Sequence, residues 1–309
     1  MQTIARLARG AARRLRALTH RTPGPEREAV ATRVYDDAAS PEVARRIDEL
    51  AERNRTSTRS IVDPTSPVTV TMTSHGRRVD RAWTALESIA DGAALPARIV
   101  LSLSPTDARG IGPELQRLVA RGLEVLEVEQ QLGVHTKWYP ISEDLETPLV
   151  TSDDDQLYPR DWLADLIRVH REHPDDVVVH RAHVIGLTDD EVDPYLRWHP
   201  CMTVEPSPRH FGTSVSGQLF PVAVHRAGRA SGTRFLEVAP SNDDIWLHAA
   251  ALEIGASVRQ VRPAPANYDF VPDTQIEGLY QGNVMGGRND EQMAATYGAV
   301  ALARLRAGR

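Results

Sequence analysis

The chain of 309 residues is poor in cysteine, lysine and aromatic residues. Its one cysteine, Cys201, excludes an intramolecular disulfide framework and a cysteine-based zinc site, and it favours a reducing compartment. Aromatic residues make up only 5% of the chain, but 41% of the residues are hydrophobic, which is enough for a sizeable core. The length fits one large α/β domain or two modest ones.

Long hydrophobic runs and basic stripes are also missing. No stretch reaches the roughly 18 apolar residues that a membrane-spanning helix needs, so we expect no such helix. Residues 1–21 lack the continuous apolar segment of a secretory signal, which favours a cytoplasmic location. The net charge of −6 and the lack of a basic stripe in the body of the chain argue against nucleic acid as a partner.

The first 21 residues instead form a basic amphipathic pattern. Apolar residues recur at helical spacing among arginines, with no acidic residue between them: Ile4, Leu7, Ala11, Leu15 and Leu18. This pattern is typical of a helix that lies on an anionic membrane surface, which would make the protein peripheral on the inner face of the cell membrane. A solvated tail is the alternative, and a transit peptide fits less well.

A change in pattern near residue 67 predicts the domain organisation. The basic stretch is followed by a Thr-Pro-Gly-Pro break at 22–25, a helical stretch over 41–55 and a polar linker over 56–67. Regular alternation of strands and helices begins only at Val68. We therefore predict an N-terminal helical appendage and linker over 1–66, and one domain over 67–309.

This alternation predicts an α/β fold. The expected strands are 68–72, 98–103, 123–128 and 149–151, and the expected helices between them are 79–90 and 113–121. Such an order is the signature of a parallel sheet covered by helices. Ligands of these sheets bind beyond the carboxyl ends of the strands, where residues 73–77 and 153–155 are expected.

Three consecutive carboxylates, Asp153, Asp154 and Asp155, follow the short strand 149–151. They repel one another unless water or a cation neutralises them, and Mg²⁺ and Mn²⁺ prefer oxygen ligands of this kind together with substrate phosphates. In an extended backbone, Asp153 and Asp155 point to the same side. We therefore assign those two to the metal and Asp154 to ribose or sugar hydroxyls. The alternative is a solvated acidic turn.

Lys137 is the only lysine among 36 lysine and arginine residues. Because arginine occupies the other positions of this set, the lysine suggests that a compact ammonium group is needed here. A diphosphate is a natural partner for such a group. His135, two residues earlier, is a candidate ligand for the same substrate. Its alternative role is packing in the core.

A second acidic pair, Asp243 and Asp244, follows Asn242 at the start of an expected helix over 244–252. Asn242 or Asp243 could simply cap this helix, since acidic residues stabilise a first turn. In the functional interpretation, one of the two aspartates is a general base that takes a proton from an acceptor hydroxyl. The two interpretations are compatible.

The loop from Gly212 to Gly217 is a weaker candidate. It lacks the Gly-Lys-Ser/Thr continuation of a nucleotide P-loop. A flexible glycine loop could still let a substrate approach the backbone, and we include Gly217 as a candidate binding residue.

In their order and spacing, these segments resemble bacterial glycosyltransferases of the family 2-like group that is linked to capsular and cell-surface polysaccharide synthesis. The resemblance extends over Val68–Gly255. Its motifs are TSHGR at 73–77, LPARIVL at 95–101, RGLEV at 121–125, GVHTKWYP at 133–140, TSDDDQLYP at 151–159 and NDDIWL at 242–247.

The resemblance implies a GT-A fold with a mixed, mainly parallel central sheet and a DXD motif at Asp153 and Asp155 that holds Mn²⁺ or Mg²⁺. The loop residues Thr73, Ser74, His75 and Arg77 would then lie near the nucleotide, and Lys137 near its diphosphate. Asp243 or Asp244 would supply the base of an inverting reaction. The usual Glu-Asp pair is replaced here by Asn-Asp-Asp.

The expected activity is thus the transfer of a sugar from a nucleotide-diphosphate donor to a saccharide or lipid-linked saccharide acceptor. A metal-dependent nucleotidyltransferase is a second possibility, although residues 73–77 make a poor phosphate loop for one. A non-catalytic glycan-binding or scaffold protein is a third, and it predicts no metal-dependent nucleotide binding.

Overall fold

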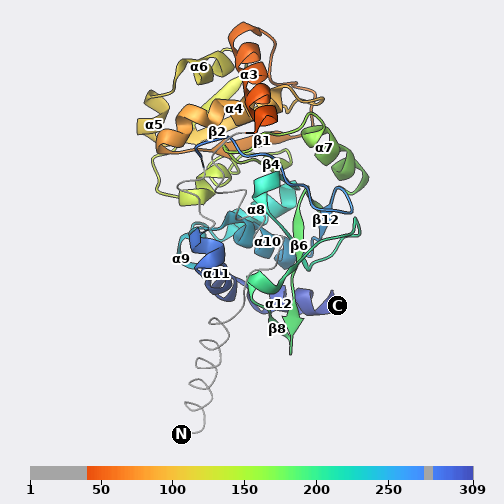
Figure 1. The fold of residues 1–309 in the computed structure, drawn as a ribbon. Helices are drawn as coiled ribbons and strands as arrows, with labels where there is room; N and C mark the ends of the chain where they lie inside the picture. The colour runs from red at the N-terminus through yellow and green to blue at the C-terminus, as the bar shows by residue number, and fades with distance from the viewer. Residues whose placement is uncertain (1–39, 275–280, 309) are drawn as a thin grey trace. The chain divides into compact units, whose positions relative to one another are not determined.

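The computed structural model describes residues 40–274 and 281–308 (Figure 1). The amphipathic pattern of residues 1–21 and the break at 22–25 lie outside the described residues, so the expected membrane contact stays a prediction. Among the described helices, none is long and apolar enough to cross a membrane.

The centre of the fold is a seven-stranded sheet. Its spatial order is β12 (Val258–Gln260), β5 (Val177–Val179), β11 (Gln218–Phe220), β4 (Leu149–Thr151), β1 (Thr69–Thr73), β2 (Arg98–Leu103) and β3 (Leu123–Glu127). β11 runs antiparallel to its neighbours β4 and β5, whereas the other neighbouring pairs are parallel. The predicted α/β fold with a mixed, mainly parallel sheet is confirmed.

Both faces of the sheet are covered, because successive side chains of a strand point to opposite faces. Val150 and Val178 belong to one apolar core, and their neighbours Leu149 and Val177 belong to another. The first core contains α4 (Val79–Ala90) and α7 (Trp162–Glu172). The second contains α8 (Val222–Ala230) and α10 (Asp243–Ile254). This layered arrangement is the one that the alternation of strands and helices predicted.

Helix α3 (Pro41–Thr56) belongs to the same core as the sheet, contrary to the boundary expected at residue 66. Its Leu50 is fully buried, as is Ile61 in the following segment, and both belong to the core that contains α4. Glu87 of α4 is also fully buried, and Arg53 of α3 forms an ion pair with it, with Nε 3.0 Å from Oε1. Residues 41–66 therefore belong to the same compact unit as the sheet. An isolated helical pattern in the sequence could not reveal this packing partner.

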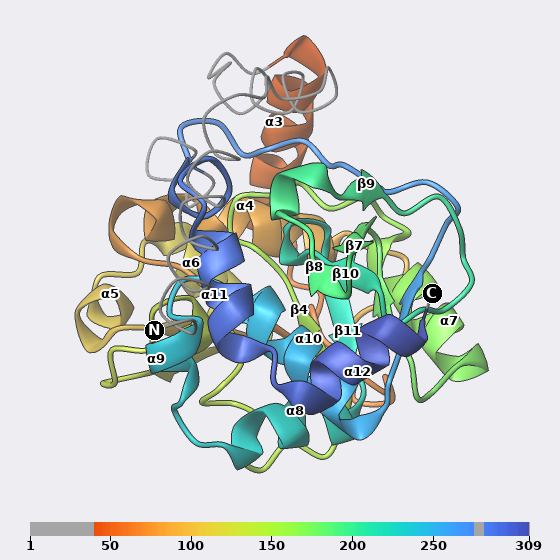
Figure 2. The ribbon, with the colours of Figure 1, turned by 90° about the horizontal axis from the view of Figure 1, so that it is seen from below.

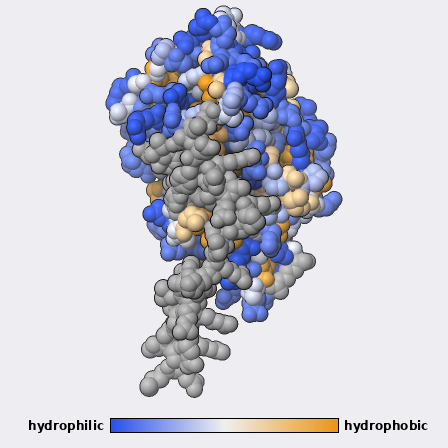
Figure 3. Space-filling model, viewed as in Figure 1, coloured by the Kyte–Doolittle hydropathy of each residue, from blue (hydrophilic) through white to orange (hydrophobic). Residues whose placement is uncertain are grey.

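The second half of the chain adds short elements around α10. β6 (Ala182–Val184) pairs with β9 (His199–Pro200) and β10 (His210–Gly212) in a small antiparallel sheet. Helices α11 (Arg288–Thr296) and α12 (Ala299–Ala307) pack on α10, as Figure 2 shows from below. The described part of the face in Figure 3 is mainly hydrophilic, with scattered hydrophobic residues. Gln292 and Asn289 of α11 bond to Ser241 and Asn242, directly before Asp243 at the start of α10.

Candidate active site

Two loops meet at the carboxyl edge of the parallel strands. β1 ends at Thr73, β4 ends at Thr151, and the two strands pair in parallel with Thr71 opposite Thr151. The loop after β1 therefore lies beside the acidic triplet that follows β4. This is the edge where ligands of such sheets bind, as the sequence predicted.

Asp154 is the central anchor of the triplet. Its side chain is buried and accepts from Ser74 Oγ at 2.5 Å and from Arg78 Nε at 3.2 Å, and it also forms an ion pair with Arg78 Nη2. Ser74 thus lies beside the triplet and its hydroxyl donates to this carboxylate, while its expected contact with a nucleotide stays a prediction. Asp154 was expected to bind sugar hydroxyls. With these donors around it, it holds the loop after β1 instead.

Arg78 is a site residue that the sequence interpretation missed. The same Nη2 atom lies 2.8 Å from Oδ2 of Asp155, so one guanidinium group joins two members of the triplet. Burial by itself lowers the pKa of Arg78, but the charges of Asp155 and Asp154 outweigh that effect and raise the pKa. Arg78 follows Arg77 directly, and nothing in the sequence indicates which of the two turns toward the acids.

Lys137 connects the triplet to α10. It ends the short 3₁₀ helix Gly133–Lys137 and is buried. Its ammonium group lies 2.5 Å from Oδ1 of Asp153 and 3.6 Å from Oδ2 of Asp243. Burial lowers its pKa, but the charges of Asp153 and Asp243 outweigh burial, so the pKa is raised and the ammonium form is held. Three separate sequence motifs therefore meet at one cation.

The start of α10 combines capping with an acidic pair. Asn242 is the N-cap, and its Oδ1 accepts from the backbone N–H of Ile245 at 3.1 Å. Asp243 is buried, and its Oδ2 has no hydrogen-bond partner in the part of the chain that the structure describes; it faces Lys137. The capping interpretation therefore holds for Asn242 and leaves both aspartates to the site.

Asp244 occupies a different environment from Asp243. Its Oδ1 accepts from Ser214 Oγ at 2.5 Å and from Gln218 Nε2 at 2.7 Å, and the Ser214 N–H donates to it as well. Burial, followed by the charge of Asp243, raises the pKa of Asp244 to about 7, although the Ser214 donors act in the opposite direction. Asp244 can therefore exchange a proton near neutral pH.

Three further candidates for substrate binding lie at the end of β1 and in the loop after it. Thr73 Oγ1 donates to the backbone oxygen of Ser102 at 2.9 Å, which fixes the end of β1 to β2. His75 and Arg77 are exposed at the same edge of the sheet. Their positions suit contact with a ligand at this edge, and their roles stay predictions.

His135 lies in the core and not in the site. It is fully buried and stacks on Phe235, with ring centroids 4.0 Å apart. Trp138 Nε1 donates to its Nδ1 at 3.0 Å, which leaves Nε2 to donate to the Ala239 oxygen at 2.8 Å. Burial lowers its pKa, so the ring is neutral. The expected ligand role is corrected to the packing role that was the alternative.

Gly217 has a structural reason to be glycine. Its φ is +92°, and a Cβ atom would lie 2.5 Å from Nε1 of Trp162. The same Nε1 donates to the Ser216 oxygen at 2.8 Å. The residue allows the loop to pass against the indole ring, so the expected approach of a substrate to its backbone has no support in this packing.

A set of buried amide side chains holds the turn before α10. Asn283 and Ser241 exchange two hydrogen bonds of 2.7 Å, and the Ser241 N–H donates to Gln292 at 3.0 Å. Asn242 Nδ2 donates to Asn289 Oδ1 at 2.8 Å. We call Asn283, Asn289 and Gln292 the amide clasp. The sequence showed Asn283 and Asn289 only as part of a glycine-rich segment near the C-terminus, with no indication that they pack against this turn.

The composition of the site fits a hard divalent cation. Five carboxylates surround two basic side chains in this network: Asp153, Asp154, Asp155, Asp243 and Asp244 around Arg78 and Lys137. Among residues 40–274 and 281–308, no three carboxylate, histidine or cysteine side chains form a complete metal cage. Mg²⁺ commonly binds one or two carboxylates, with waters and phosphate oxygens completing its shell. Asp153 and Asp155, both partly exposed, could serve as such ligands.

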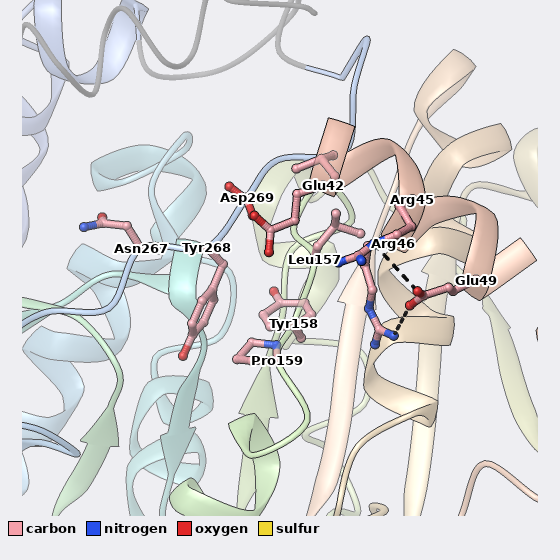
Figure 4. A pocket seen from close by; sticks show the side chains of 11 residues that line it. Glu42, Arg45, Arg46, Glu49, Leu157, Tyr158, Pro159, Asn267, Tyr268 and Asp269 are labelled. Atoms are coloured by element: carbon pink, nitrogen blue, oxygen red, sulfur yellow. Dashed lines mark ion pairs between the residues drawn. The ribbon is translucent and has the colours of Figure 1, made fainter. Parts of the chain in front are cut away.

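A separate pocket of about 280 Å³ lies between α3 and the segments 157–159 and 267–269 (Figure 4). Its Arg45 and Arg46 form ion pairs with Glu49 of the same helix. Tyr158 joins the pocket to the acidic site, because its hydroxyl accepts from the Asp153 N–H at 2.7 Å. None of the predicted site residues lines this pocket.

The sequence matches no protein-family model and no curated protein. Among solved structures, the chain is similar to mannosyltransferase PcManGT from Pyrobaculum calidifontis in complex with GDP-Man and Mn²⁺. The identity is 13%, over 84% of this chain and 74% of that one, and the TM-score is 0.48.

It is also similar to S. aureus TarS 1–349, with 12% identity over 65% of this chain, 59% of that chain and a TM-score of 0.41. A third similar structure is 4-diphosphocytidyl-2C-methyl-D-erythritol synthase from Anaerococcus prevotii, with 12% identity over 74% of this chain, all of that chain and a TM-score of 0.44.

Proposed function

We propose that this chain is a glycosyltransferase that moves a sugar from a nucleoside diphosphate donor to a hydroxyl acceptor, with Mn²⁺ or Mg²⁺ at Asp153 and Asp155. One observation carries the proposal: the Lys137 ammonium group lies between Asp153 and Asp243 and joins the acidic strand end to the start of α10. A diphosphate bound there would meet a fixed positive charge close to the acidic pair at the start of α10.

The partly exposed Asp153 and Asp155 would hold the cation, which when bound neutralises charge on the diphosphate. Lys137 would stabilise the negative charge that develops on the leaving group. Its second carboxylate, Asp243, keeps the ammonium group beside the site.

We assign the base to Asp244. Asp243 forms an ion pair with Lys137, whereas Asp244 has a pKa of about 7, which suits proton transfer at neutral pH. Asp244 takes the proton of the acceptor hydroxyl. The acceptor oxygen bonds to the anomeric carbon, the bond from that carbon to the diphosphate oxygen breaks with its electron pair, and the nucleoside diphosphate leaves.

The test is a screen of nucleotide sugars and nucleoside triphosphates with Mn²⁺ and saccharide acceptors, in which the released product is identified. The proposal predicts release of a nucleoside diphosphate that depends on acceptor and metal. Release of pyrophosphate from a triphosphate would show a nucleotidyltransferase instead. Asp244→Asn should reduce turnover by about 100-fold or more, and Asp48→Asn, at an exposed position of α3, serves as the matched control.

A further inference from the structure

We propose that Arg78 is an internal counter-ion that competes with the divalent cation for Asp155. The Arg78–Asp155 ion pair and cation binding at Asp155 would then oppose each other. This inference rests on the metal site of the proposed function and adds to it a residue that controls the affinity of that site.

Arg78 holds the two carboxylates unequally. It contacts Asp154 through two nitrogens, with Nε at 3.2 Å from Oδ2 and Nη2 on Oδ1, whereas it contacts Asp155 through Nη2 alone, at 2.8 Å. Asp154 is only 4% exposed and also accepts from Ser74. A guanidinium fork on one carboxylate is a stronger and more directional contact than a single shared donor. Arg78 is therefore held mainly by Asp154, and its single contact with Asp155 is the one that a cation can displace.

The same arrangement recurs on the other side of the triplet. Lys137 pairs with Asp153 and retains Asp243 as a second carboxylate. Each of the two candidate metal ligands, Asp153 and Asp155, is thus paired with a basic residue that has another carboxylate within reach. A cation could take both ligands without leaving either basic side chain buried and unpaired, which would be costly.

Arg78 cannot yield by losing its proton, because a guanidinium group stays charged at any pH at which the protein is folded. A cation that approaches Asp155 therefore meets a positive charge on the same carboxylate, and in this partly buried setting the repulsion is screened only weakly. In the cation-free protein, the same charge relieves the repulsion within the triplet. Arg78 would weaken cation binding and keep the empty site stable.

The test measures binding of Mn²⁺ alone, by electron paramagnetic resonance of the free ion, to the full-length protein. Arg78→Gln should bind Mn²⁺ about tenfold more tightly than the wild type, because the competing charge is gone. Arg81→Gln is the matched control: it removes the same charge one turn along α4, where Arg81 is half-exposed and pairs with Asp273 at 3.5 Å. Its affinity should stay within about twofold of the wild type.

Equal or weaker Mn²⁺ binding by Arg78→Gln would overturn the inference and leave the proposed function intact. Absence of Mn²⁺ binding in the wild type and in all variants would overturn the metal site itself. If Arg78→Gln does not fold, ¹⁵N resonances of arginine side chains in the wild type decide the question, with Arg78 assigned through Arg78→Lys. Saturating Mg²⁺ should shift the Arg78 guanidinium signal and leave that of Arg81 in place; an unchanged Arg78 signal would refute the competition.

Discussion

The ammonium group of Lys137 donates to Oδ1 of Asp153 across 2.5 Å in a largely buried setting. The same group lies 3.6 Å from Asp243. Because the three residues come from different segments, this cation holds together the end of β4, the 3₁₀ helix Gly133–Lys137 and the start of α10.

Lys137→Met should lower the free energy of unfolding by about 3 kcal/mol, because it leaves two carboxylates without their counter-charge. Urea unfolding at pH 7 measures the loss. Arg98→Met is the control, since Arg98 pairs with Glu124 where both side chains are nearly half-exposed, and it should cost about 1 kcal/mol or less. A similar small loss for both variants would show that the Lys137 pairs add little to the fold.

Asp154→Ala should mainly reduce stability, whereas Asp155→Ala should mainly reduce activity. Asp154→Ala removes the anchor of Arg78 and Ser74 and should destabilise the protein by about 3 kcal/mol or more. Asp155→Ala leaves that anchor in place, so it should cost about 1 kcal/mol but abolish metal-dependent turnover. Thermal unfolding and product release, measured on both variants, check this. Full activity in Asp155→Ala would remove Asp155 from the metal site.

The free energy of unfolding should depend on pH in a way that reports the raised pKa of Asp244. Its folded pKa of about 7 lies above the ordinary value of 3.8, so the folded state binds this proton more tightly than the unfolded chain. The resulting stabilisation is fully present below about pH 4 and is lost as the pH rises through about 7.

Relative to Asp244→Asn, which cannot titrate, the wild type should therefore lose a few kcal/mol, on the order of 1.4 per pKa unit, between pH 4 and pH 8. Urea unfolding of both proteins across this range isolates the contribution of Asp244 from the other titrating groups. A constant difference between the two proteins would contradict the raised pKa.

The amide clasp should matter more for activity than for stability. Asn283→Ala removes two hydrogen bonds from Ser241, two residues before the acidic pair, and should cost about 1–2 kcal/mol of stability. It should also lower kcat at least tenfold, because a base displaced by about 1 Å loses much of its effect. A loss of stability with kcat unchanged would show that the clasp supports the fold alone.

Gly217→Ala tests the packing explanation of the glycine. The added Cβ would clash with Trp162 at a φ that alanine rarely adopts, so we expect a loss of about 2 kcal/mol or more and a change in tryptophan fluorescence. Gly76→Ala provides a comparison in which the φ of +54° is also positive but nothing lies within 4 Å of the added atom. Gly76→Ala should lower the free energy of unfolding by about 1 kcal/mol. An equal loss at both positions would show that the contact with Trp162 does not explain the glycine at position 217.

The sequence predicted the elements that have a strong local pattern. The helix over 79–90 was found with the same bounds, because Trp83, Leu86 and Ile89 recur on one face and pack against the sheet. The strand over 98–103 likewise matches β2. The direction of β11 could not be predicted from its apolar residues, since antiparallel pairing with β4 and β5 depends on the path of the chain between them.

At the site, the motifs identified the acids and Lys137 but not their partners. Arg78 and the amide clasp contribute through contacts between residues far apart in the chain, which no local spacing encodes. His135 was predicted to bind substrate, but the structure places it in the core. It stands two residues from Lys137, yet in the 3₁₀ helix the two side chains point to different surroundings, one to the core and one to the acids.

The most direct measurement is calorimetric titration of the wild-type protein and Asp155→Asn with UDP and GDP, each with and without Mn²⁺. We predict that the wild type binds at least one of these diphosphates, that binding requires Mn²⁺, and that Asp155→Asn, although folded, loses it. Diphosphate binding of equal strength without Mn²⁺, or in Asp155→Asn, would contradict a cation held between the acidic triplet and the diphosphate.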